Sequence, residues 1–135
     1  LALAVGCYIA GWGAMVFARH ANREGHGAAA QAALVLSPLV TLVGAAAMLG
    51  AVWLPGLDPV SHVYPAMVWA FAIWTVLHTL PGVVMPLYCL AGIRFGKLTP
   101  EHDADLWNST LYWHFLLITA VVSALVIGVL PRMMT

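Results

Sequence analysis

Charged residues are scarce in this sequence. Asp, Glu, Lys and Arg together make up 7% of the 135 residues, whereas soluble domains average roughly 25%. So few charges cannot cover a globule with a solvated surface, which excludes a soluble monomer. The hydrophobic content of 63% also excludes intrinsic disorder, because disorder requires low hydrophobicity and high net charge. The composition therefore indicates an integral membrane protein whose charges lie in loops.

Basic surfaces and metal-binding motifs are lacking as well. Five Lys and Arg balance five Asp and Glu, so no basic surface for nucleic acid is expected. Cys7 and Cys89 lie in apolar runs without metal-binding spacing, and they do not indicate a disulfide framework. His102 stands between Glu101 and Asp103, which could bind a surface metal ion. A solvated acidic loop is the simpler interpretation of these three residues.

The sequence contains long apolar runs. Four of them reach or approach the length of about 20 residues that a helix needs to cross a bilayer. The sequence therefore predicts an all-α, polytopic membrane protein, a single domain over 1–135 with four transmembrane helices in a bundle. The predicted helices cover about 1–17, 28–54, 64–93 and 106–130. The first run begins without Met or a polar flank, so we expect further sequence upstream; a signal peptide is the alternative.

The basic residues predict how the chain is oriented. The connections 19–27 and 94–105 lie on the same side of the membrane and together contain four of them, whereas the other side has only Arg132. Basic loops remain in the cytoplasm, so we expect both connections to be cytoplasmic and both chain ends to lie outside. The four cytoplasmic basic residues are Arg19, Arg23, Arg94 and Lys97.

Small residues recur at four-residue steps in the first two predicted helices. Such stripes predict helix–helix seams, because association in lipid depends on close packing. A chance pattern in an Ala-rich sequence is the alternative. In the third predicted helix, small and polar residues share one side that we expect to face protein. The stripes are Ala2, Gly6, Ala10 and Ala14, then Ala33, Ser37, Thr41 and Ala45, and the polar side carries Thr75, His78, Thr79 and Gly82.

His78 and His114 are the histidines that fall within predicted helices. A haem with two histidine ligands requires both imidazoles at equal depth. At about 1.5 Å per residue, His114 lies roughly 12 Å and His78 roughly 24 Å from the cytoplasmic side, which argues against a shared haem. We interpret both as neutral side chains hydrogen-bonded between helices, although an ionisable residue within a membrane is also a functional candidate. All five carboxylates lie in predicted loops, so no catalytic group is predicted.

Several short motifs follow one another in the second half of the chain. His78 precedes Gly82 by four residues, and the helix that contains them ends at Ile93-Arg94. The loop Gly96-Lys97-Leu98-Thr99-Pro100-Glu101-His102 comes next, and Tyr112-Trp113-His114-Phe115 opens the last helix. In this order and spacing, residues 78–115 resemble subunit III of the haem–copper cytochrome c oxidases. The tetrapeptide is the most specific part of the resemblance.

The resemblance is limited to residues 78–115, since the first two predicted helices match the family only in hydropathy, and the four-helix chain is similar to the family's last four helices. The family usually has a His-Gly pair just before the position of His78, where this chain has Thr75-Val76, and an Asp where it has Leu117. The full family also has seven helices and a buried Glu on its third. The chain is therefore similar to a shortened subunit III, or to the subunit III part of a fused subunit I–III, without the first, lipid-cradling helix pair.

The resemblance implies a non-catalytic membrane subunit of a terminal haem–copper oxidase that accepts electrons from cytochrome c or quinol. Such a subunit packs on subunit I, beside subunit II, binds phospholipid, and supports aerobic respiration in the bacterial inner membrane. Haem and copper of the oxygen-reducing, proton-pumping complex are expected in subunit I, with no cofactor in this chain. The residues expected to contact lipid or another subunit are His78, Arg94, Lys97, Trp107, Trp113 and His114.

Three other functions stay open. Proteins similar to subunit III also accompany nitric oxide reductase, and only the chains that co-purify would separate these two assignments. A b-type cytochrome anchor that takes electrons from quinol would show a haem spectrum. A small transporter would need a polar pore lining, for which the sequence offers little.

Overall fold

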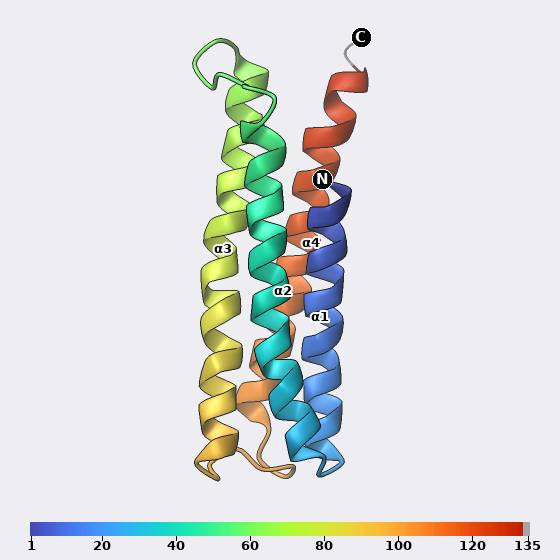
Figure 1. Ribbon diagram of the computed structural model, residues 1–135, viewed down its shortest axis with the longest axis vertical. Helices are drawn as coiled ribbons and strands as arrows, with labels where there is room; N and C mark the ends of the chain where they lie inside the picture. Colours follow the sequence, from blue (N-terminus) through green and yellow to red (C-terminus); the bar gives the residue numbers. More distant parts are fainter. Residues whose placement is uncertain (134–135) are drawn as a thin grey trace.

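The computed structural model describes residues 1–133, with side chains up to Val129. Four helices make up the chain over this range: α1 (Ala2–Arg23), α2 (Gly27–Trp53), α3 (Val63–Arg94) and α4 (Ala104–Met133). They run alternately up and down, and each packs on its two neighbours in the order α1, α2, α3, α4 and back to α1 (Figure 1). All four are long and apolar enough to cross a membrane. The predicted all-α, four-helix membrane bundle is thus confirmed.

The first helix is longer than predicted. α1 continues to Arg23, so most of the connection expected over 19–27 is helical, and the turn itself is short. The basic side chains here occupy only part of the helix surface, while Ala18, Ala21 and Asn22 continue the buried face. Beyond the end of α1 at Arg23, Gly25 has a φ of 79°, which permits the amide of His26 to donate to the carbonyl of Ala21.

The other predicted boundaries differ by smaller amounts. α3 ends at Arg94, one residue later than predicted, and α4 begins at Ala104, two residues earlier. Gly96, with a φ of 67°, closes α3 in the same way as Gly25 closes α1. The connections after α1 and after α3 lie at the same end of the bundle, and the connection after α2 lies at the other (Figure 1).

Of the two predicted small-residue seams, one is confirmed and one is wrong. Ala33, Ser37, Thr41 and Ala45 are all buried on α2. On α1, however, Ala2, Gly6 and Ala10 are exposed, and the buried face instead carries Ala4, Tyr8, Gly11, Met15 and Ala18. Small size permits close packing but does not require it. The inward face of α1 is the one that carries the Tyr8 hydroxyl, which bonds Thr79, and Gly11, which permits the closest helix contact, because packing and hydrogen bonds drive helix association in lipid.

Gly11 marks the closest approach of α1 to its neighbours. A β-carbon at this position would lie 2.8 Å from the Trp113 ring and 3.2 Å from the Ser37 carbonyl oxygen, and it would also overlap the Thr41 hydroxyl. The Trp113 side chain is 1% exposed. The indole of α4 therefore packs directly on the backbone of α1, beside α2.

Hydroxyl groups join three helices in the interior. The Tyr8 hydroxyl of α1 lies 2.7 Å from the Thr79 hydroxyl of α3, and Thr79 donates to the Thr75 carbonyl at 3.0 Å. The Thr75 and Ser123 hydroxyls, from α3 and α4, lie 2.7 Å apart. The predicted polar side of α3 thus faces protein at Thr75, Thr79 and Gly82, which are buried. His78, the fourth residue of that side, is only half-buried.

We predict that Gly11→Ala destabilises the bundle by about 1–3 kcal/mol, the usual range for inserting a methyl group into a well-packed core. Neither the buried indole nor the Ser37 backbone can move aside easily. Thermal unfolding of the detergent-solubilised chain measures the effect. Gly13→Ala is the matched control, because a β-carbon there has nothing within 4 Å. Equal stability of the two variants would contradict the close approach.

Candidate functional site

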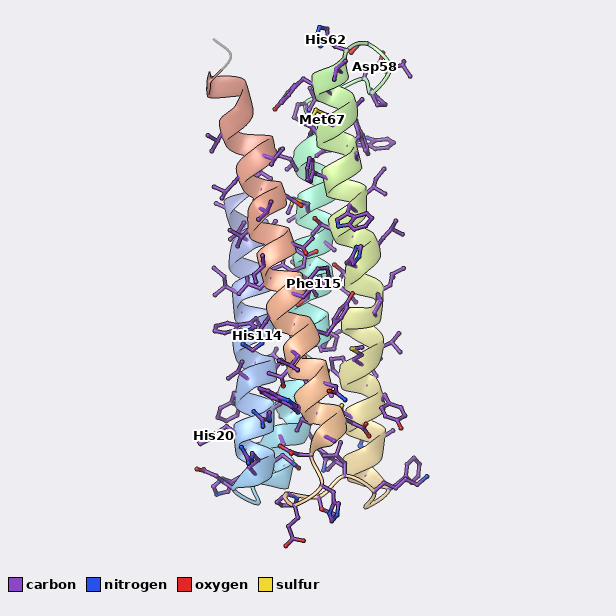
Figure 2. The ribbon with its side chains drawn as sticks, turned by 180° about the vertical axis from the view of Figure 1, so that it is seen from behind. His20, Asp58, His62, Met67, His114 and Phe115 are labelled. Atoms are coloured by element: carbon purple, nitrogen blue, oxygen red, sulfur yellow. The ribbon has the colours of Figure 1, made fainter. Side chains whose placement is uncertain are left out.

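A groove of about 410 Å³ lies between α1 and α4, near the end that carries the two basic connections. Both helices contribute one face to it, since the lining residues recur at steps of three and four. Figure 2 shows His20 and His114 on the side where these two helices meet. The lining residues are Trp12, Val16, Arg19, His20 and Arg23 from α1, and Trp107, Thr110, Leu111 and His114 from α4.

The mouth of the groove is basic. Arg19 and Arg23 both approach the same carboxylate, that of Asp103, with Nε–Oδ2 distances of 3.3 and 3.7 Å. Asp103 does not itself line the groove, and no carboxylate is among the lining residues. Two guanidinium groups thus share one carboxylate, which leaves donors free to meet a further anion.

Two contacts hold the mouth in place. The Arg19 guanidinium lies 4.0 Å above the centre of the Trp107 ring, a cation–π contact between α1 and α4. The Asn22 side chain, which is buried, donates to the Thr99 carbonyl at 3.4 Å and ties the connection after α3 to α1. The position of Arg19 is therefore determined by α4 and by the connection after α3.

The deeper part of the groove is mostly apolar. Trp12, Val16 and Leu111 line it on the way from the basic mouth towards His114. The His114 ring packs edge-on against the Trp12 indole, with ring centres 5.6 Å apart. A basic mouth above an apolar channel suits a molecule with an anionic head group and an alkyl chain.

The structure brings together only some of the residues that the sequence predicts to contact lipid or another subunit. Trp107 and His114 line the groove. Trp113 lies in the core, where its Nε1 has no hydrogen-bond partner among the described residues. Arg94 and Lys97 are exposed outside the groove, and the Arg94 Nε lies 3.5 Å from the Gln31 side-chain oxygen.

The predicted interhelical hydrogen bond of His114 is wrong. Its Nδ1 lies 2.7 Å from the Thr110 carbonyl oxygen, one turn earlier on the same helix. The His78 Nδ1 likewise lies 2.8 Å from the Trp74 carbonyl oxygen. In both cases the ring N–H donates within its own helix, and among the described residues neither imidazole forms a hydrogen bond to another helix.

The observed helix bounds keep the two histidines at different depths. His78 stands 16 residues before Arg94, the end of α3, and His114 stands 10 residues after Ala104, the start of α4, which is a difference of about 9 Å at about 1.5 Å per residue. The histidines also contact different neighbours, since the His114 ring packs on Trp12 of α1 and the His78 ring lies 5.5 Å from the Phe115 ring of α4. Within residues 1–133, no three His, Cys, Asp or Glu side chains gather as possible metal ligands.

Trp12 and the shared carboxylate of Asp103 were not predicted from the sequence. The available signal was the spacing of Trp12, Val16, Arg19 and Arg23 on one helical face. Because the sequence predicts a loop over 19–27, Arg19 and Arg23 serve there only to predict the orientation of the chain, not to form a site. The extension of α1 is what aligns them with the apolar residues below.

Comparison with known proteins adds no family to this description. The sequence matches no protein-family model and none of the curated proteins. The resemblance of residues 78–115 to oxidase subunit III therefore stays a prediction, carried by the motifs themselves.

We predict that Asp103→Asn lowers the free energy of unfolding by about 0.5–1 kcal/mol, the usual range for a partly exposed ion-pair network. High salt should reduce the difference from the wild-type chain, because ions screen exposed charges. Thermal unfolding in detergent at low and high ionic strength measures both effects. Glu101→Gln, in the same connection but outside any ion pair of the described residues, should leave stability unchanged. The same loss in both variants would count against the network.

Proposed function

We propose that this chain is a non-catalytic membrane subunit of a terminal haem–copper oxidase, equivalent to the last four helices of subunit III. It is either a separate chain or the part fused behind subunit I. One observation carries the proposal: residues from both ends of the resemblance make contact. The Tyr112 hydroxyl donates to the His78 carbonyl at 2.7 Å, and the Phe115 ring packs on the His78 ring. The shared motifs thus form one structural unit between α3 and α4, which supports a common origin.

The distribution of polar groups supports a role beside the redox centres. Three of the carboxylates, Glu24, Glu101 and Asp103, lie in the connections after α1 and α3, and Asp105 lies in the first turn of α4. Asp58 lies in the connection after α2. The interior carries hydroxyl groups in place of carboxylates. On this proposal, subunit I supplies haem, copper and oxygen reduction, and this chain packs against it.

The groove supports the lipid-binding part of the proposal. Its basic mouth fits a phospholipid phosphate, and its apolar depth fits one acyl chain. The groove lies within the four helices that the chain has, between α1 and α4. Lipid binding therefore does not require the helix pair that begins the full family.

The proposed orientation places the groove mouth at the cytoplasmic side of the bacterial inner membrane. The connections after α1 and α3 share one end of the bundle, and these connections with the adjoining helix ends contain Arg19, Arg23, Arg94 and Lys97 (Figure 1). The positive-inside rule assigns this end to the cytoplasm.

Purification of the complex from native membranes through a tag on this chain tests the proposal. We expect oxidase subunits I and II in constant ratio to the tagged chain, together with their haem spectrum. After separation, the tagged chain should show no reduced-minus-oxidised haem band. Nitric oxide reductase chains in place of oxidase chains would support the first alternative. Haem retained on the separated chain would support a b-type cytochrome anchor, and either result would overturn the proposal.

We predict that the double variant Arg19→Gln, Arg23→Gln lowers the amount of phospholipid that stays bound through purification by at least about fivefold. Each basic residue near a membrane surface contributes about 1 kcal/mol to the attraction of anionic lipid. Mass spectrometry of lipid extracted per mole of chain measures the loss. Arg94→Gln is the control, because Arg94 lies outside the groove and should meet only exchangeable bulk lipid. An equal loss in both variants would indicate a general charge effect and contradict a specific site.

A further inference from the structure

The outer surface where α3 meets α4 carries a polar atom in the middle of the membrane. His78 stands 15 residues after Val63 and 16 residues before Arg94, the two ends of α3. At about 1.5 Å per residue, either end of the helix is more than about 20 Å away along the axis. Its side chain is only half-buried within the bundle, so part of the ring faces outward at this depth.

The hydrogen bond within α3 determines which ring nitrogen is free. The His78 Nδ1 lies 2.8 Å from the Trp74 carbonyl oxygen, and a carbonyl can only accept, so Nδ1 carries the proton. In a neutral imidazole the other nitrogen is then an acceptor without a proton. Among the described residues, the ring makes no second hydrogen bond. The His78 Nε2 is therefore an acceptor without a donor at mid-membrane.

Three contacts hold the ring in this position. The Trp74 and Phe115 rings flank it, with centres 4.3 and 5.5 Å away, and the Tyr112 hydroxyl binds the His78 carbonyl. Trp74 is 54% exposed and Phe115 is 45% exposed. Together, Trp74, His78 and Phe115 form the His78 patch, an outward-facing aromatic surface with one fixed acceptor.

Lipid cannot satisfy this acceptor. Acyl chains have no hydrogen-bond donors, and polar groups left unpaired in hydrocarbon are costly. Histidines within membranes face protein or a water-filled cavity for this reason. We propose that the His78 patch docks a transmembrane helix of a different protein chain, which places an O–H or N–H donor on Nε2.

The chemistry of the patch argues against its pairing with the same patch on a second copy of this chain. Two His78 rings meeting across a two-fold axis would bring two acceptors together, with no proton between them. A Ser, Thr, Asn or Gln side chain on a partner helix supplies the missing donor, as such residues do between membrane helices. The inference rests on the proposed function only in assuming a partner chain, and it names the face on which that partner packs.

Photo-crosslinking in native membranes tests the inference, with a photoreactive phenylalanine analogue at position 115 of the full chain. We expect an adduct with a transmembrane segment of another chain, identified by mass spectrometry. His78→Leu should reduce the adduct by about fivefold, in line with the strength of one interhelical hydrogen bond. His78→Gln keeps an acceptor and should preserve it. His62→Leu should also preserve the adduct, because His62 lies exposed at the start of α3, outside both the groove and the His78 patch.

Thermal unfolding of the detergent-solubilised variants shows whether His78→Leu still folds. For a folded variant, four results would overturn the inference: an adduct with lipid only, an adduct with a second copy, an adduct unaffected by His78→Leu, or a haem band that only this variant loses. The proposed function fails separately. Docking of a helix that belongs to no oxidase would overturn that function and leave this inference standing. Oxidase chains that co-purify without any adduct at position 115 would overturn this inference and leave the proposed function standing.

Discussion

Hydrogen bonds between hydroxyl groups join three of the four helices in the interior of this bundle. In hydrocarbon such bonds are favoured, because neither water nor lipid offers a hydroxyl another partner. Tyr8 reaches Thr79, and Thr75 reaches Ser123, so that α1, α3 and α4 meet at the same depth. The tight packing of Trp113 on Gly11 lies next to this network and depends on the same alignment.

The bundle has two different lateral surfaces. On one side, α1 and α4 leave a groove with a basic mouth and an apolar depth, which suits a phospholipid. On the side where α3 meets α4, the His78 patch presents aromatic rings and a fixed acceptor, which suits a protein helix. Under the proposed function, the groove binds lipid and the His78 patch contacts the partner chain.

Helical periodicity explains which predictions succeeded. The α2 stripe from Ala33 to Ala45 is buried as expected, because the large buried residues of this helix, Leu34 and Met48, lie on the same face. The α1 stripe failed because Tyr8 and Met15 lie on another face, where the Tyr8 hydroxyl finds its partner in Thr79.

The sequence by itself determined that this is a four-helix membrane protein, because apolar length and scarce charge leave no other way to satisfy the backbone and the surface. It also placed the basic residues at one end. Only the tertiary structure decided that Arg19 and Arg23 share Asp103 above an apolar groove, and that the His78 acceptor faces outward. Those features depend on how α1 ends and how α3 and α4 cross. At the groove mouth, side chains 80 or more residues apart in sequence meet through packing that no local pattern encodes.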